Sequence, residues 1–358
     1  MTKKILLTAT VQSHICQFHR PLVEVLHEHG YEVQVAARNN LAEKNGLKLD
    51  FVERVYDLPF SRSPKSPDNI KAYKELKEII EQEQFEIIHC NTPVGGVVSR
   101  LAAKEARKQG TKVFYTAHGF HFYKGASKKN WAIFYPIEKY MANYCDTLIT
   151  VNYEDYELVK KKFSCRVEHI HGVGVDTNRY HPCSDEERTE IRRREGFKDE
   201  DFIVLCTGEL LPNKNQKALI QAAALLKDKI PNLKVCIAGN GRLESELKNL
   251  VKELHLEDTV IFLGYRPNLN FFVPATDCNV ACSFREGMPL NVIEAMLCKR
   301  PVVVSHNRGH NELIEDGVNG YLVEPSDTEG FADRIYVVYQ SKDVQVYFGE
   351  NGYKKAQA

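Results

Sequence analysis

The stretch "CNVACSFREGMPLNVIEAMLCKRPVVVSH", residues 278–306, decides the fold. Two short apolar runs of strand length, at residues 278–283 and 301–306, flank an apolar helical pattern that begins near Pro289. Strands and helices alternate in this way when the strands are parallel and the helices cover the faces of their sheet. The stretch therefore predicts one unit of an α/β fold.

The same alternation continues along the whole chain. A chain of 358 residues is too long for one compact core and suggests two domains. We predict two doubly wound, Rossmann-like α/β domains. Their strands are expected at residues 4–11, 32–38, 50–56, 85–90, 112–118, 146–152 and 166–171, and then at 202–208, 234–239, 260–264, 278–283, 301–306 and 320–325. Helical patterns lie between them, at residues 17–30, 68–83, 95–110, 215–230 and 241–255.

The predicted seam is the polar stretch "NRYHPCSDEERTEIRRREGFKDED", residues 178–201. It has no strand pattern, many charges and one proline, which is typical of a surface connection. We predict an N-terminal domain at residues 1–177, a linker at 178–201 and a C-terminal domain at 202–358. Two such domains are expected to face each other across a cleft at the carboxyl ends of their strands, where ligands bind.

Composition excludes several classes of function. Lys and Arg balance Asp and Glu, 48 against 48, so the chain does not have the charge of a nucleic-acid binder. No apolar run approaches the roughly 18 residues of a membrane span, and the start of the chain lacks the long apolar centre of a signal peptide. The ten cysteines are scattered, which favours reduced thiols in a cytoplasmic protein over a disulfide framework.

Glu286 and Glu294 are the first candidate site residues. Glu286 lies in the turn, where it could accept hydrogen bonds from a sugar, and Glu294 lies about one turn into the helix, where it could hold the hydroxyls of a ribose. With Pro289 at the first helical position, the free N–H groups of this helix N-terminus suit a diphosphate. The alternative is that both carboxylates are ordinary groups at the entrance of a helix.

Two further glycine-containing turns follow strands of the second half. "TGELLPNKNQ", residues 207–216, places Lys214 ahead of a helix, where its ammonium could neutralise a phosphate or simply be solvated. "AGNGRLESEL", residues 238–247, has Gly239 and Gly241 at a tight turn. This turn is an incomplete dinucleotide fingerprint, so it does not predict a nicotinamide cofactor.

In the first half, "YTAHGFHFYKG" places His118 directly after a strand. It could hydrogen-bond a sugar hydroxyl or the departing phosphate, or it could be structural. His14 and His19 follow the first strand and could line the acceptor side or pack against their helix. His121 belongs to the same polar and aromatic loop as His118 and is assigned to the acceptor side.

Lys124, Lys128 and Lys129 are interleaved with Tyr123 and Trp131. Lysines mixed with aromatic side chains are typical of contact with an anionic membrane surface. A solvated loop and helix face is the alternative.

Taken in order, "YTAHGFHFYKG", "IHGVGVDTNRYHP", "TGELLPNKNQ", "AGNGRLESEL", "FLGYRPN", "FREGMPLNVIEAM" and "DGVNGYLVEP" resemble the retaining glycosyltransferases of family 4 over nearly the whole chain. Within that family they resemble the branch of bacterial exopolysaccharide and capsule synthesis. The resemblance implies a two-domain GT-B fold and a catalytic group of His118, Glu286 and Lys214. The implied donor-binding residues are Gly208, Lys214, Gly239, Gly241, Tyr265, Arg266, Glu286, Gly287, Met288, Pro289, Leu290, Glu294 and Arg308.

The implied roles divide the donor among these residues. Glu286 would bind the hexose, Glu294 the ribose and Lys214 the diphosphate. Tyr265 and Arg266 would lie by the base, and His118 by the sugar at the reacting centre.

The resemblance also implies the reaction and its partners. A hexose or N-acetylhexosamine would move from a nucleotide-sugar, with a UDP-sugar expected, to a glycan acceptor linked to a lipid diphosphate. The reaction would need no metal and no other cofactor, and the protein would be cytoplasmic and peripheral on the anionic inner face of the cell membrane. A nucleotide-sugar epimerase of related architecture and a non-catalytic nucleotide-sugar-binding subunit remain as alternatives.

Glu209 departs from the family pattern. Many members carry an arginine at this position, paired with the lysine on the diphosphate, and a carboxylate cannot replace that cation. Our hypothesis is that Arg308 supplies the missing charge. The chain also ends at "GENGYKKAQA", earlier than expected for a family whose last helix usually crosses back to the first domain.

Overall fold

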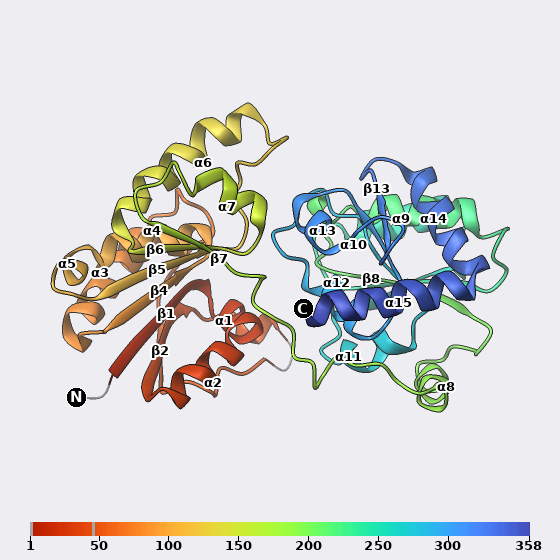
Figure 1. Ribbon diagram of the computed structural model, residues 1–358, viewed down its shortest axis with the longest axis horizontal. Helices are drawn as coiled ribbons and strands as arrows, with labels where there is room; N and C mark the ends of the chain where they lie inside the picture. Colours follow the sequence, from red (N-terminus) through yellow and green to blue (C-terminus); the bar gives the residue numbers. More distant parts are fainter. Residues whose placement is uncertain (1–2, 45–46) are drawn as a thin grey trace. The chain divides into compact units, whose positions relative to one another are not determined.

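The computed structural model describes residues 3–44 and 47–358, and the chain divides into two compact units that meet between Gly174 and Val175. Each unit contains one sheet whose strands are all parallel, as the alternating pattern predicts (Figure 1). The predicted GT-B architecture of two parallel-sheet α/β domains is therefore present.

The first unit contains a seven-stranded sheet in the order β3-β2-β1-β4-β5-β6-β7. Successive side chains of its inner strands point into two different cores. In β1, Ile5 and Leu7 pack on one face of the sheet with α1 and α2, and Leu6 packs on the other face with α3 and α4. Every predicted strand is present, although the third, sixth and seventh are shorter than predicted. The strands are β1 (Lys3–Val11), β2 (Tyr31–Arg38), β3 (Arg54–Asp57), β4 (Ile87–Asn91), β5 (Lys112–Ala117), β6 (Thr147–Thr150) and β7 (Arg166–His169).

The helices of this unit correct two predictions. The helix expected at 17–30 begins only at Arg20, because the backbone leaves the helical region at His19; a separate helix ends just before it, at Phe18, and Pro21 lies in the first turn of the second helix. The helix expected at 95–110 is two helices, α4 and α5. The helices are α1 (Gln12–Phe18), α2 (Arg20–Glu28), α3 (Asp68–Glu83), α4 (Pro93–Ala102), α5 (Lys104–Lys108), α6 (Lys128–Met141) and α7 (Tyr153–Val159), with short 3-10 turns η1 (Leu41–Glu43) and η2 (Ala142–Tyr144).

The second unit repeats the scheme with a six-stranded sheet in the order β10-β9-β8-β11-β12-β13. Its strands are β8 (Phe202–Thr207), β9 (Leu233–Ala238), β10 (Val260–Gly264), β11 (Cys278–Ala281), β12 (Val302–Ser305) and β13 (Tyr321–Val323). Its helices are α8 (Asp185–Arg194), α9 (Gln216–Leu226), α10 (Glu244–Glu253), α11 (Leu269–Phe272), α12 (Leu290–Leu297), α13 (Arg308–Leu313), α14 (Thr328–Gln340) and α15 (Lys342–Gln357), with turns η3 (Pro212–Lys214) and η4 (Val273–Ala275).

The segment predicted as a linker, 178–201, is part of the second unit. Its helix α8 starts with a capping box formed by Ser184 and Glu187. From α8, Arg192 extends into the interior, where only 2% of it is exposed, and donates to Asp277 at 2.6 Å. Two charged residues of this segment, Arg188 and Arg192, therefore hold α8 onto the unit, while Glu190 and Arg193 are exposed.

Asp277 is the centre of this buried cluster. Its Oδ2 also accepts from the backbone N–H of Ile203 at 2.7 Å, and its Oδ1 accepts from Arg188. The remaining donors of Arg192 reach main-chain carbonyls, including that of Ala275 at 2.9 Å. One carboxylate therefore connects α8, the start of β8 and the start of β11.

No helix within residues 3–44 and 47–358 is both long and apolar enough to cross a bilayer. All ten cysteines are free thiols, in agreement with their scattered spacing.

The strand orders locate the places where a ligand can bind. In each sheet the chain starts at a central strand, builds outward to one side, and then returns to build the other side. The order reverses between β1 and β4 in the first unit and between β8 and β11 in the second. Doubly wound sheets bind ligands outside the carboxyl ends of the strands at such a reversal.

Candidate functional site

Lys214 and Glu286 meet at the reversal point of the second sheet. Lys214 ends η3, in the connection after β8, and Glu286 lies in the turn after β11. The Lys214 Nζ donates to Glu286 Oε1 at 2.7 Å, and both side chains are mostly shielded from solvent. Burial raises the pKa of Glu286, but the neighbouring Lys214 charge and hydrogen bonds from Lys214 and Ser283 outweigh it and leave this pKa below its ordinary value. The pair is therefore an ammonium and a carboxylate.

Two glycines allow the strand ends to approach each other beside this pair. A Cβ on Gly239 would lie 2.0 Å from the carbonyl oxygen of Gly208, and Gly239 has a φ of +143°. A Cβ on Gly241 would lie 2.4 Å from the carbonyl oxygen of Leu210. Gly208 lies against the side chain of Lys214, because a Cβ there would contact Lys214 Cδ at 3.4 Å. The three predicted glycines thus position the Lys214 loop.

Arg308 lies in the same group. It is the first residue of α13, is 8% exposed, and donates from Nε to the carbonyl oxygen of Glu286 at 3.2 Å. Its guanidinium is thus held against the main chain beside the Lys214 partner. Glu209, in contrast, is exposed. That Arg308 supplies the cation missing at position 209 stays a prediction.

His310 is a buried residue of this site that sequence reasoning did not identify. Its Nδ1 lies 2.7 Å from the carbonyl oxygen of Ser305 and 2.8 Å from the Nδ2 of Asn307. Asn307 caps α13 by accepting from the N–H groups of Gly309 and His310. Burial lowers the pKa of His310 to about 4, so the ring is neutral. The ring and the cap hold the turn that carries Arg308.

Glu294 faces a different part of the second unit from Glu286. It lies in α12, where burial raises the pKa of its carboxyl to about 7, against the opposing effects of a hydrogen bond from Tyr180 and the charge of Arg179. The same burial and the same carboxyl raise the pKa of the Tyr180 hydroxyl. Tyr180 lies in the stretch predicted as linker, which is why it was missed.

The other predicted donor residues lie around these groups. Pro289 precedes α12 as its N-cap and is not the first helical residue, because its ψ of 95° is extended. Met288 and Leu290 pack with their side chains against the apolar core. Arg266 is paired with Glu195 at 2.8 Å, and Tyr265 is half-buried beside it.

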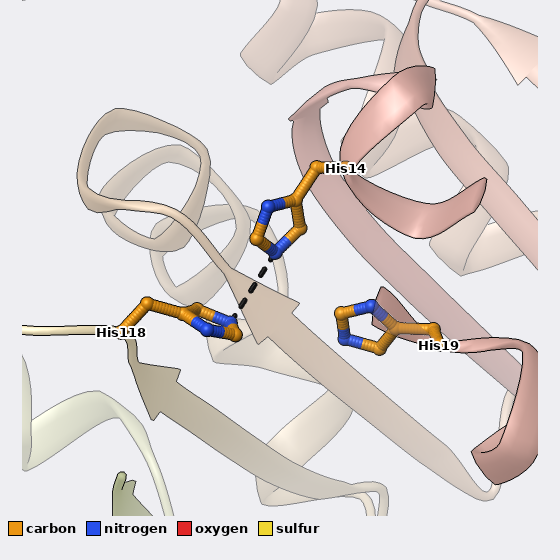
Figure 2. Close-up of side chains that lie close together, drawn as sticks. All are labelled: His14, His19 and His118. Atoms are coloured by element: carbon orange, nitrogen blue, oxygen red, sulfur yellow. Dashed lines mark hydrogen bonds between the residues drawn. The ribbon is translucent and has the colours of Figure 1, made fainter. Parts of the chain in front are cut away.

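A second group of candidate residues gathers at the reversal point of the first sheet. His14 comes from α1, His19 from the junction of α1 and α2, and His118 directly follows β5 (Figure 2). The Nε2 atoms of His14 and His118 are 3.2 Å apart. Asn91, at the end of β4, lies between His19 and His118, with its Oδ1 3.1 Å from the Nε2 of each.

Electrostatics keep this histidine group neutral. Burial, as the largest cause, lowers the pKa of His19 to about 4 and that of His118 to about 3. Burial together with the neighbouring rings also places the pKa of His14 well below its usual value. Asn91 Oδ1 can only accept, so His19 and His118 both carry their proton on Nε2 in this arrangement.

The remaining residues assigned to the acceptor and membrane side divide into packed and exposed ones. His121 stacks on Phe134 with ring centroids 4.6 Å apart, and Trp131 donates from its ring nitrogen to the carbonyl oxygen of Tyr123 at 3.1 Å. These rings pack partly against the core. Lys124, Lys128 and Lys129 are exposed.

Helix α6 carries an apolar surface beside these lysines. Ile133, Ile137 and Tyr140 are 42%, 43% and 59% exposed, and their spacing places them on one face. The opposite face is anchored by Glu138, which pairs with the fully buried Arg100 at 2.8 Å. The exposed apolar side chains nearest the predicted lysines are therefore those of the two isoleucines and Tyr140.

Comparison with known proteins matches both halves of the chain. The model "Glycosyltransferase Family 4" matches residues 20–179, and the model "Glycosyl transferases group 1" matches residues 187–355. EpsD of Bacillus subtilis, to which a glycosyltransferase activity is ascribed, is 44% identical over 99% of this chain and 92% of its own. The UDP-Gal:α-D-GlcNAc-diphosphoundecaprenol α-1,3-galactosyltransferase of Escherichia coli is 26% identical over 86% of this chain and 81% of its own.

Among solved structures, Anabaena HepE in complex with UDP and glucose superposes with a TM-score of 0.80. The match covers 99% of this chain and 95% of that one at 22% identity, so it supports the fold.

Proposed function

This chain belongs to family 4 of the glycosyltransferases, and from that premise we propose that it transfers a hexose or N-acetylhexosamine from a UDP-sugar to a lipid-linked glycan acceptor in exopolysaccharide or capsule synthesis. The observation that carries the proposal is the Lys214–Glu286 pair at the reversal point of the second sheet. The names of two relatives support its parts: HepE is described with UDP and with UDP-glucose, and the Escherichia coli enzyme by a diphosphoundecaprenol acceptor.

In the proposed reaction, the donor diphosphate takes the place of Glu286 as the partner of Lys214. The carboxylate of Glu286 is then released to accept hydrogen bonds from the sugar hydroxyls. Lys214 and Arg308 stabilise the charge that develops on the departing diphosphate, a contribution that a fixed and partly desolvated cation makes efficiently.

The configuration at the transferred sugar would be retained. The departing diphosphate oxygen takes the proton of the acceptor hydroxyl on the same face of the sugar, so the step needs no protein nucleophile and no metal. His118 would hold the sugar in position.

The experiment that tests the proposal is incubation with labelled UDP- and GDP-sugars together with a diphosphate-linked lipid acceptor. Transfer of label to the lipid supports the proposal. Isomerised donor without transfer would instead indicate an epimerase, and donor binding without turnover would indicate a non-catalytic subunit. The retained configuration is read from the anomeric coupling of the product.

Arg308→Ala tests whether this arginine supplies the missing cation. A hydrogen bond to a charged group contributes about 1.5–3 kcal/mol, so the donor Kd is expected to rise by roughly ten- to a hundredfold. Arg285→Ala, in the neighbouring turn, serves as the control for a general loss of positive charge. An Arg308→Ala protein with the donor affinity and rate of the parent would exclude the role.

Glu294 predicts a pH dependence of donor binding. Ribose hydroxyls donate to a carboxylate, and because the pKa of Glu294 is about 7, this group is largely protonated below that pH. The Kd of UDP-glucose is therefore expected to rise about tenfold between pH 8 and pH 6. For Glu294→Gln, calorimetry should show weaker binding of UDP-glucose and a smaller change of its Kd with pH. An equally large change of Kd with pH in that variant would show that another group titrates.

We further propose that α6 attaches the protein to the cytoplasmic membrane surface. Apolar side chains flanked by lysines bind an anionic bilayer by burial and by charge together. Ile137→Glu, on the exposed stripe, is expected to abolish co-sedimentation with vesicles containing phosphatidylglycerol. Ile70→Glu, at a more exposed isoleucine on α3, is the control, and equal loss in both variants would contradict the assignment.

A further inference from the structure

The histidine group of the first unit has a geometry that its proposed role beside the sugar does not require. His14, His19 and His118 each offer one ring nitrogen, and these three atoms all lie within 4.8 Å of one another (Figure 2). We propose that they form, with Asn91, a binding site for Zn²⁺ or a similar transition-metal ion that inhibits the protein.

Three of the separations between the ligand atoms match those of a small tetrahedral site, and the three histidine nitrogens lie within 4.8 Å of one another. Zinc binds imidazole nitrogen at about 2.0–2.1 Å, so neighbouring tetrahedral ligands lie about 3.3 Å apart. The His14–His118 separation is 3.2 Å. Asn91 Oδ1 lies 3.1 Å from the Nε2 atoms of both His19 and His118 and supplies the fourth ligand.

Metal binding would change the tautomers of two of the rings. A histidine binds a metal through a ring nitrogen that carries no proton. On binding, the Nε2 protons of His19 and His118 move to Nδ1, so the rings change tautomer without a change of charge. The Nδ1 of His19, which has no hydrogen-bond partner in the structure, can hold such a proton.

The positions of the ligands give the site rigidity. They lie at the ends of three adjacent strands: His14 and His19 follow β1, Asn91 ends β4, and His118 follows β5. Asn91 is fully buried and His19 is 3% exposed, whereas His14 and His118 are partly exposed. The two partly exposed ligands, His14 and His118, leave a path for the ion, and the two buried ligands, Asn91 and His19, fix its position.

Inhibition rests on the proposed function, because it follows from the role of His118 beside the donor sugar. A cation held by His118 Nε2 occupies the atom that would hydrogen-bond the sugar. Nitrogen ligands of this kind favour zinc, nickel and copper over magnesium and calcium. The proposed transfer therefore proceeds without a metal and is blocked by zinc.

The test uses the full chain after removal of metals with a chelator. Titration with Co²⁺ is expected to give the intense visible absorption of a tetrahedral site at one ion per chain, and Zn²⁺ is expected to displace it. His14→Gln should weaken binding by more than about tenfold, with His118→Gln as a second variant. His27→Gln, an exposed histidine on α2, is the control and should bind like the parent.

Each outcome decides the proposal. The weak absorption of octahedral cobalt, or parental affinity in both His14→Gln and His118→Gln, would overturn the site. Zinc should also lower sugar transfer by the parent protein, with recovery on adding chelator. Tetrahedral binding of cobalt without inhibition by zinc would support the metal site but contradict its inhibitory role. The cobalt spectrum does not depend on sugar transfer, so it tests the metal site even if the proposed function is wrong.

Discussion

Replacing Lys214 with methionine is expected to reduce kcat/KM for sugar transfer by about 10²–10³, the usual cost of removing one fixed group that stabilises charge in a transition state. Methionine keeps an apolar stem against Gly208 and removes only the ammonium. The loss should therefore lie mainly in kcat, with a smaller effect on donor Kd. Steady-state kinetics and calorimetry with the same nucleotide-sugar separate the two.

The control for Lys214→Met is a double variant that also removes the charge of its partner, Glu286. In Lys214→Met, the Glu286 carboxylate is left without its ammonium, so the melting temperature is expected to fall. Lys214→Met/Glu286→Gln should recover that stability, because no unpaired charge remains, but it should not recover activity. Lys217→Ala, an exposed lysine on α9, should behave like the parent. Parental kcat in Lys214→Met would refute the assigned role.

Asp277→Ala is expected to reduce the free energy of unfolding by about 3–5 kcal/mol, because it leaves the buried Arg192 charge without its carboxylate. The aspartate is 5% exposed and also accepts the backbone N–H of Ile203, which would lose its partner too. Urea unfolding of the full chain, followed by circular dichroism, measures the effect.

Glu190→Ala is the matched control on the same helix. Glu190 pairs with Arg193 on the exposed side of α8, and such surface pairs contribute about 0–1 kcal/mol. If Asp277→Ala cost no more than Glu190→Ala, the buried cluster would not be what holds α8 on the unit.

The sheets could be predicted from the sequence because each strand is a short, nearly continuous apolar run, as buried parallel strands are. The helix covering the first sheet was less predictable. The boundary between α1 and α2 at His19 depends on one backbone conformation and on Pro21. The apolar periodicity of the sequence continues across this boundary and therefore does not reveal it. The polarity of α8 was misleading for a different reason, since its buried arginine is neutralised by an aspartate far along the chain.

The candidate site was predictable where a residue directly follows a strand. His118 falls in this class, and Lys214 and Glu286 lie in the turns after β8 and β11. Residues that act through distant partners were missed: Asn91 and His310 were identified only when the structure brought the strand ends together. Asn91 does end an apolar run, and polar residues at such ends are a signal that could have identified it.

The cluster around Asp277 also has a consequence for synthesis of the chain. This aspartate pairs with residues 74, 85 and 89 positions earlier in the sequence. As the chain leaves the ribosome, α8 and β8 emerge long before their common acceptor. We therefore expect that α8 and β8 cannot pack stably until Asp277 has been synthesised. The first unit, whose residues all precede them, can fold before that point.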